Sequence, residues 1–121
     1  MIIAVDFDGT LHTGEFPAIG EPAQDVAEYM QKLHEDGHCL IIWTCRCDQK
    51  LIEAINWLID KGIPFDRIND HCPEHAGQYP TNPRKVYADL YVDDKQVGPL
   101  PAWNDIYSYV SKQQVILAAS E

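Results

Sequence analysis

Residues 2–11 read IIAVDFDGTL, an apolar run that leads directly into two aspartates separated by one phenylalanine. The run Ile2–Val5 predicts a short β-strand that is buried on both faces. Side chains alternate along an extended chain, so Asp6 and Asp8 are expected to point to one side and Phe7 to the other. Two carboxylates held this close repel each other and lose hydration, and a bound cation is the first candidate to offset that cost.

Strand-like and helix-like segments alternate along the rest of the chain. Short apolar runs predict further strands at Cys39–Thr44, Phe65–Ile68 and Ala88–Val92. Apolar residues with helical spacing predict helices at Pro22–Asp36, at Asp48–Gly62 and from Trp103 to about Ala119. Such alternation is typical of an α/β domain whose parallel sheet is covered on both faces.

Polar side chains stand at the ends of three of these strands. Asp6 follows the first strand, Thr44 ends the second and Asp93 follows the fourth. Ligands of parallel sheets bind beyond the carboxyl ends of the strands, so these side chains are expected to converge on one crevice. Two segments rich in glycine, proline and polar residues, at about 9–20 and 69–84, predict a flap and a long loop.

The composition is that of an ordinary soluble protein with a single domain, residues 1–121. The formal net charge of −10 disfavours nucleic acid as a partner, because such a surface repels phosphates. No apolar run approaches the ~20 residues that a membrane helix needs, and the N-terminus lacks the features of a secretory signal. The cysteines at positions 39, 45, 47 and 72 do not have the spacing of a dense disulfide framework, so free thiols in the cytoplasm are expected.

The sequence DFDGT behind an apolar strand resembles the first motif of the haloacid dehalogenase-like (HAD) superfamily of phosphotransferases with an aspartate nucleophile. The segment LIIWT, which ends at Thr44, resembles the second motif of that superfamily. Lys85 resembles the basic third motif, and LYVDD, with Asp93 and Asp94, resembles the acidic fourth. The motifs occur in the family's order, and the resemblance covers nearly the whole chain.

This resemblance implies a Rossmann-like three-layer sandwich with a mainly parallel sheet in the strand order 3-2-1-4. Superfamily members that carry a cap domain have it inserted after the first or the third strand. Residues 9–21 are too few for a folded cap at the first place, and residues 69–84 read as a loop at the second. The resemblance therefore implies a HAD-like core without a cap domain and with an open site.

The resemblance also implies a Mg²⁺-dependent phosphomonoester hydrolase that acts on a small phosphorylated substrate. Asp6 would attack phosphorus and form an aspartyl-phosphate, and Asp8 would protonate the leaving oxygen and later accept a proton from water. Mg²⁺ would bind the Asp6 carboxylate, the backbone carbonyl of Asp8 and a carboxylate of the fourth motif. Asp93 is expected to be the direct ligand, with Asp94 acting through a water or a hydrogen bond.

Thr44 and Lys85 would donate hydrogen bonds to the phosphoryl oxygens. Arg46, two residues beyond Thr44, could also reach the phosphate, but an ordinary ion pair or a surface position suits it equally well. Arg84 and Lys95 lie close to Lys85 in the sequence, so the identity of the third-motif cation stays open.

Other interpretations stay open as well. Asp93 and Asp94 could be a solvated pair at a strand end, and His12 is expected to be a solvated flap residue more than a substrate contact. The cysteines and histidines of residues 45–47 and 71–75 lack the usual spacing of zinc ligands, so zinc is disfavoured. The same chemistry would serve a phosphotransferase or mutase, and a catalytically silent metal- or phosphate-binding regulatory module is the alternative from another class. The sequence does not fix the oligomeric state, and a homo-oligomer is compatible with it.

Overall fold

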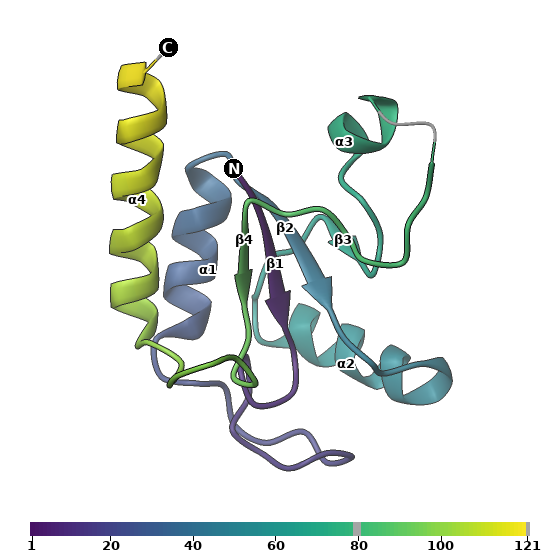
Figure 1. Ribbon diagram of the computed structural model, residues 1–121. Coiled ribbons are helices and arrows are strands. Elements are labelled where there is room, and N and C mark those ends of the chain that lie inside the picture. The colour runs from purple at the N-terminus through teal and green to yellow at the C-terminus, as the bar shows by residue number, and fades with distance from the viewer. Residues whose placement is uncertain (79–80, 121) are drawn as a thin grey trace.

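The computed structural model describes residues 1–78 and 81–120 of the chain. Four strands form one sheet, namely β1 (Ile2–Asp6), β2 (Cys39–Trp43), β3 (Arg67–Ile68) and β4 (Leu90–Val92). Their order is β3-β2-β1-β4 and every pairing is parallel (Figure 1). The α/β fold class and the strand order 3-2-1-4 expected from the sequence are confirmed.

The helices are α1 (Val26–Glu35), α2 (Asp48–Asp60), α3 (Pro73–Gln78) and α4 (Trp103–Ser120). The chain steps in the same direction from β1 to β2 and from β2 to β3, so right-handed crossovers place α1 and α2 on the same face of the sheet. Val5 and Ile42 on that face share one buried core with Met30 of α1, Leu58 of α2 and Val110 of α4. Each such side chain contributes about 1.5–3 kcal/mol through its burial.

The opposite face of the sheet is covered by the segment that joins β3 to β4. Ala4 and Ile41 point to that side because side chains alternate along a strand, and they pack against Val86 and Ala88. Residues 73–78 of this segment form α3, so the long loop expected at residues 69–84 is partly helical. Residues 79 and 80 of that expected loop lie outside the described residues. Within the described residues, neither this segment nor the flap forms a separate cap domain.

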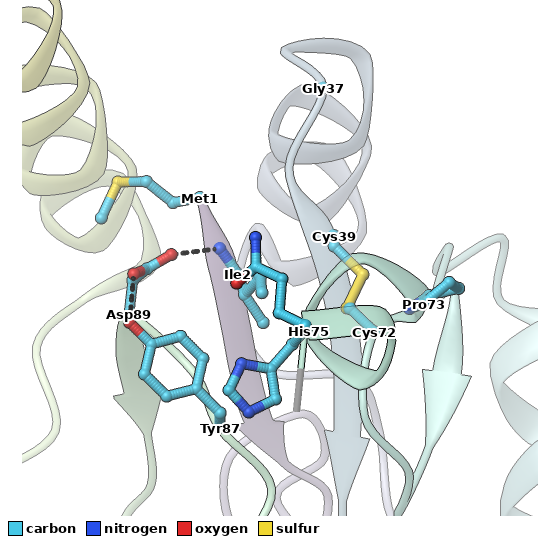
Figure 2. A pocket seen from close by; sticks show the side chains of 10 residues that line it. Met1, Ile2, Gly37, Cys39, Cys72, Pro73, His75, Tyr87 and Asp89 are labelled. Atoms are coloured by element: carbon cyan, nitrogen blue, oxygen red, sulfur yellow. Dashed lines mark hydrogen bonds between the residues drawn. A yellow bond between two sulfur atoms is a disulfide. The ribbon is translucent and has the colours of Figure 1, made fainter. Parts of the chain in front are cut away.

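A disulfide joins Cys39, the first residue of β2, to Cys72, the residue before α3 (Figure 2). The expectation of free thiols is therefore wrong for this pair, whereas Cys45 and Cys47 are free and exposed. The expectation failed because Cys39 and Cys72 are separated by 33 positions and meet only through the crossover between β3 and β4. The bond lines a cavity of about 420 Å³ at the amino-terminal edge of the sheet, which Tyr87 also borders (Figure 2).

The first helix starts at Val26 and not at Pro22, as the sequence pattern had suggested. Pro22 forms an isolated antiparallel bridge with His12, so it belongs to the flap that folds back over the first motif. Both α1 and α2 are followed by glycines with positive φ, Gly37 at 89° and Gly62 at 68°, as expected for helix ends.

The last helix, α4, extends well beyond the sheet (Figure 1). Its first half is anchored by the buried residues Trp103, Ile106 and Val110, whereas Val115 and Ile116 near its end are exposed. No described helix combines the length and the apolar character that a membrane crossing requires.

We expect Cys72→Ser to lower the free energy of unfolding by about 3–4 kcal/mol, because the disulfide restricts a loop of this length in the unfolded chain. Chemical denaturation under non-reducing conditions measures the change. Trypsin should also cleave faster after Arg84 and Lys85, since their segment loses its covalent attachment to β2. Cys45→Ser removes an exposed free thiol and is the matched control. Equal stability and equal cleavage of the Cys72→Ser protein and the wild type would contradict this account.

Candidate active site

The carboxyl ends of β1, β2 and β4 open into a cavity of about 380 Å³. Its lining residues are Asp6, Asp8, Phe16, Thr44, Cys45, Arg46, Asp93 and Lys95. Parallel pairing sets Asp6 of β1 opposite Trp43, and Val5 opposite Val92, so three strands end at the same level. The convergence of polar strand ends expected from the sequence is present, and most of the predicted site residues share this cavity.

An acidic cluster forms where Asp93 and Asp94, which follow β4, lie beside Asp6. Carboxylate oxygens of the three residues lie within 4.8 Å of one another, a spacing that one divalent cation can bridge. Thr10 Oγ1 lies 3.2 Å from Asp6 Oδ2 and 3.2 Å from Asp94 Oδ1, and it accepts a hydrogen bond from the Asp94 backbone N–H. A hydroxyl has a single proton, so Thr10 donates to one of the two carboxylates at a time.

The acidic cluster holds more negative charge than its neighbours compensate. Burial raises the pKa of Asp6 to about 7, with further contributions from its hydrogen bond to Asp94 and from the charges of Asp93 and Asp94. Burial also opposes ionisation of Asp94, but hydrogen bonds from Asp6 and Thr10 outweigh it and lower the pKa of Asp94. Asp6 and Asp94 therefore share a proton near neutral pH when no cation is bound. This purely oxygen donor set suits Mg²⁺.

Gly9 permits the close approach of the first and fourth motifs. Its φ of 81° lies in the left-handed region, which side chains disfavour. A Cβ at this position would collide with the carboxylate of Asp94. The glycine of the DFDGT motif is therefore needed both for the turn and for the acidic cluster.

The carboxylate of Asp8 lies outside the acidic cluster and forms an ion pair with Arg46. Arg46 donates from Nε to Oδ2 at 2.9 Å and from Nη2 to Oδ1 at 2.7 Å. His12 Nε2 lies 2.8 Å from the same Oδ1. The Nδ1 of His12 accepts hydrogen bonds from the backbone N–H groups of Gly14 and Gly20, so the ring proton must be on Nε2, which donates to Asp8.

These contacts keep Asp8 ionised. Burial would raise the pKa of Asp8, but the hydrogen bonds and charges of Arg46 and His12 outweigh burial and hold it below its usual range. The two aspartates of one motif thus have pKa values shifted in opposite directions. Such a separation is found where two carboxylates have different chemical roles.

Two residues of this site, His12 and Thr10, were not predicted as functional. His12 is completely buried, so the expectation of a solvated flap histidine is wrong. The sequence pattern around His12 gave little indication of its burial, because Gly14 and Gly20 reach its ring only in the folded flap. Thr10 was within reach of prediction, since it belongs to the DFDGT motif and a threonine hydroxyl suits a carboxylate pair.

Arg46 lines the cavity with its side chain fully buried. Its guanidinium binds Asp8 and also donates to the backbone carbonyl of Pro17 in the flap at 3.0 Å. Of the roles left open by the sequence, the ion pair is therefore present, and the contact with phosphate stays a proposal.

The two lysines that compete for the third-motif role lie in different places. Lys95 lines the cavity. Lys85 is not among the lining residues, and its ammonium lies 4.9 Å from the centre of the Tyr91 ring. Tyr91 pairs with Ala4 of β1, and Asp6 lies two residues further along the same face. Lys85 therefore stands on the face of the sheet from which Asp6 projects.

The zinc alternative gains no support from the described part of the chain. Cys72 is bonded to Cys39, and the His71 ring interacts with the backbone carbonyl of Pro83 at 3.1 Å and with the backbone N–H of Tyr87. Among residues 1–78 and 81–120, the group of side chains close enough to hold a metal ion is the acidic cluster.

Fold and site together define a small α/β domain with an all-parallel, four-stranded sheet and an acidic cluster at its carboxyl edge. Among solved structures the chain is similar to a conserved protein coded by a locus of Bacteroides thetaiotaomicron, with 38% identity and a TM-score of 0.82. The similarity covers 93% of this chain and 91% of that chain, so the chain belongs to the same family as this conserved Bacteroides protein. No protein-family profile and no curated protein matches the chain.

We expect the affinity for Mg²⁺ to fall below about pH 7, by up to about tenfold per pH unit, because the cation must displace the proton held by Asp6. Isothermal titration calorimetry between about pH 5.5 and pH 8 measures this dependence. An affinity that does not change over this range would contradict the assignment of Asp6 as a ligand.

The raised pKa of Asp6 also makes the free energy of unfolding depend on pH. Between pH 3.8 and about 7, Asp6 holds its proton in the folded metal-free protein but loses it in the unfolded chain, so the contribution of Asp6 to stability decreases as pH rises through this window. We expect Asp6→Asn to raise the unfolding free energy of the metal-free protein at pH 8 by roughly 1–2 kcal/mol and not more, because Asp6 is only partly buried. Chemical denaturation in the presence of a chelator measures the change, and a less stable Asp6→Asn protein would contradict the raised pKa.

Proposed function

We propose that the protein is a Mg²⁺-dependent phosphomonoester hydrolase of the HAD-like superfamily and works through an aspartyl-phosphate on Asp6. The observation that carries this proposal is the acidic cluster of Asp6, Asp93 and Asp94 beside the separately held Asp8. The cluster and the backbone carbonyl of Asp8 would hold the ion. Mg²⁺ supplies the positive charge that lets an anionic phosphate approach an anionic nucleophile.

Asp6 is the nucleophile in this proposal. Its oxygen forms a bond to phosphorus while the bond from phosphorus to the leaving oxygen breaks, and the leaving oxygen takes up a proton. The carboxylate projects from the end of β1, which is paired with a strand on each side. Thr10 lies within hydrogen-bond distance of it and limits its rotation. Asp6 is thus oriented before the substrate arrives, which lowers the entropic cost of the attack.

Asp8 handles the protons. Asp8 must be protonated to donate to the leaving oxygen, and the hydrogen bonds from Arg46 oppose this protonation. The incoming phosphate is a second anion to which Arg46 can donate, so substrate binding would weaken the contact between Arg46 and Asp8. In the second step ionised Asp8 accepts a proton from the attacking water. Arg46 and His12 stabilise this ionised form.

Thr44 supplies a donor for the phosphoryl group. Its Oγ1 accepts a hydrogen bond from the backbone N–H of Arg46 at 3.1 Å, which leaves its own proton to be donated. The side chain of Asn69 binds both the N–H and the C=O of Thr44 at 2.8 Å. The backbone that carries this hydroxyl is thereby fixed.

Asp6→Asn should lower Mg²⁺-dependent phosphate release from 4-nitrophenyl phosphate on the order of 10³-fold or more, because no carboxylate remains to form the covalent intermediate. Asp60→Asn, at an exposed end of α2, is the matched control and should retain wild-type activity. Asp8→Asn should accumulate the aspartyl-phosphate, which mass spectrometry of the peptide containing residue 6 detects. An active Asp6→Asn protein would exclude the mechanism.

Lys85 keeps the proposed role of the third-motif cation, because it stands on the same face of the sheet as Asp6. Lys85→Met should lower kcat/KM for the same ester by about 10²-fold, and Lys95→Met by less than about tenfold. The reverse order of the two effects would assign the role to Lys95, which lines the cavity.

A catalytically silent metal-binding module is the second candidate. The observation in its favour is the Asp8–Arg46 ion pair, which occupies the carboxylate that catalysis requires. Mg²⁺ binding without turnover of any phosphate ester would support this candidate over the hydrolase.

The proposed compartment is the cytoplasm, as the sequence predicted. Disulfides are rare in that reducing environment, so the Cys39–Cys72 bond is the observation that counts against this compartment. The exposed free thiols of Cys45 and Cys47 are compatible with the same environment.

A further inference from the structure

Phe16 in the flap is a large apolar side chain that lines the cavity and is 57% exposed. The other residues that line this cavity are polar or charged, apart from Cys45. The exposed part of this ring is apolar surface inside a polar cavity, and a ligand that covers it would remove that surface from water.

The position of this ring is fixed relative to the site. The guanidinium carbon of Arg46 lies 5.0 Å from the centre of the Phe16 ring, and Lys50 Nζ lies 5.8 Å from it. Arg46 also donates to the carbonyl of Pro17, the residue that follows Phe16. The flap is therefore attached to the same guanidinium that binds Asp8.

The leaving group of a phosphate ester would pass beside this ring. In an in-line displacement the attacking and the leaving oxygen lie on opposite sides of phosphorus, so the leaving oxygen is directed away from Asp6 and toward the proton donor. That donor is Asp8, and Phe16 contacts the Arg46 side chain that binds Asp8. The atoms that follow the leaving oxygen would therefore extend toward the side of the cavity that Phe16 lines.

We propose that Phe16 is a stacking platform and that the substrates are phosphate monoesters whose leaving group carries a planar aromatic or heteroaromatic ring one or two bonds from the ester oxygen. This inference rests on the proposed function. A planar ring stacks on Phe16 and gains an interaction beyond the burial of area, which a saturated ring of similar size does not. Phe16 is thereby a residue that determines specificity, and Asp6 and Asp8 carry the chemistry.

Benzyl phosphate and cyclohexylmethyl phosphate form a matched pair for the test, because both release a primary alcohol of the same carbon skeleton and only one ring is planar. The wild type should favour benzyl phosphate in kcat/KM by about three- to tenfold. Phe16→Leu should bring this ratio close to one, and Phe16→Tyr should retain it. A wild-type ratio of one, or a ratio unchanged in Phe16→Leu, would overturn the inference.

The corresponding phosphonates, which cannot be hydrolysed, separate this inference from the proposed function. With Mg²⁺ present, calorimetry should show the same preference for 2-phenylethylphosphonate over 2-cyclohexylethylphosphonate, in which a CH₂ group replaces the ester oxygen, and Phe16→Leu should abolish it. If neither ester is hydrolysed but the phosphonate preference is present, the hydrolase fails and the aromatic subsite stands. If both esters are hydrolysed without preference, the hydrolase stands and the subsite fails. Thermal unfolding and Mg²⁺ binding of each variant confirm that the flap substitution has left the fold and the acidic cluster intact.

Discussion

The repulsion among three carboxylates is the constraint on which the rest of this site depends. Parallel pairing of β1 with β4 sets Val5 opposite Val92, so Asp6 and Asp93 leave the sheet side by side. Gly9 then lets Asp94 come as close as it does, and Thr10 supplies one proton to two acceptors. These contacts fix the positions of the carboxylates without neutralising them, so part of their charge is left over, and this charge adds to the larger effect of burial in raising the pKa of Asp6. A divalent cation is the group whose charge and ligand preference match that remainder.

The DFDGT motif places its two aspartates in opposite electrostatic environments. Asp6 faces other carboxylates, whereas Asp8 faces a buried guanidinium and a histidine that donates from Nε2. The separation follows from the path of the chain: after Gly9 the flap turns back, and residues His12 to Pro22 fold over Asp8. Because the same segment lies over one aspartate and not over the other, a single local motif produces two different carboxylates.

Features that depend on local sequence were predictable, whereas features that depend on contacts between distant segments were not. The convergence of Asp6, Thr44 and Asp93 was predictable, because it follows from short apolar runs and from a general property of parallel sheets. The strand order was predicted from the resemblance of the motifs to those of the HAD-like superfamily. The burial of His12 and the disulfide of Cys39 were not, because each depends on the tertiary path of a segment with no periodic pattern of its own. Arg46 lies between these cases: its position near the site was predictable, but its ion pair with Asp8 depends on the path of the flap.

The disulfide and the acidic cluster lie at opposite ends of the strands in this small domain. The disulfide joins the start of β2 to the segment that covers one face, at the edge opposite to the cavity that holds Asp6 and Asp93. A domain of this size has little hydrophobic stabilisation in reserve, and a cluster of partly buried like charges reduces it further. A covalent bond at the far edge can offset that loss without touching the carboxylates, since it acts mainly on the unfolded chain. The three carboxylates can therefore stay close together despite their repulsion, and this is the property that would favour a bound cation.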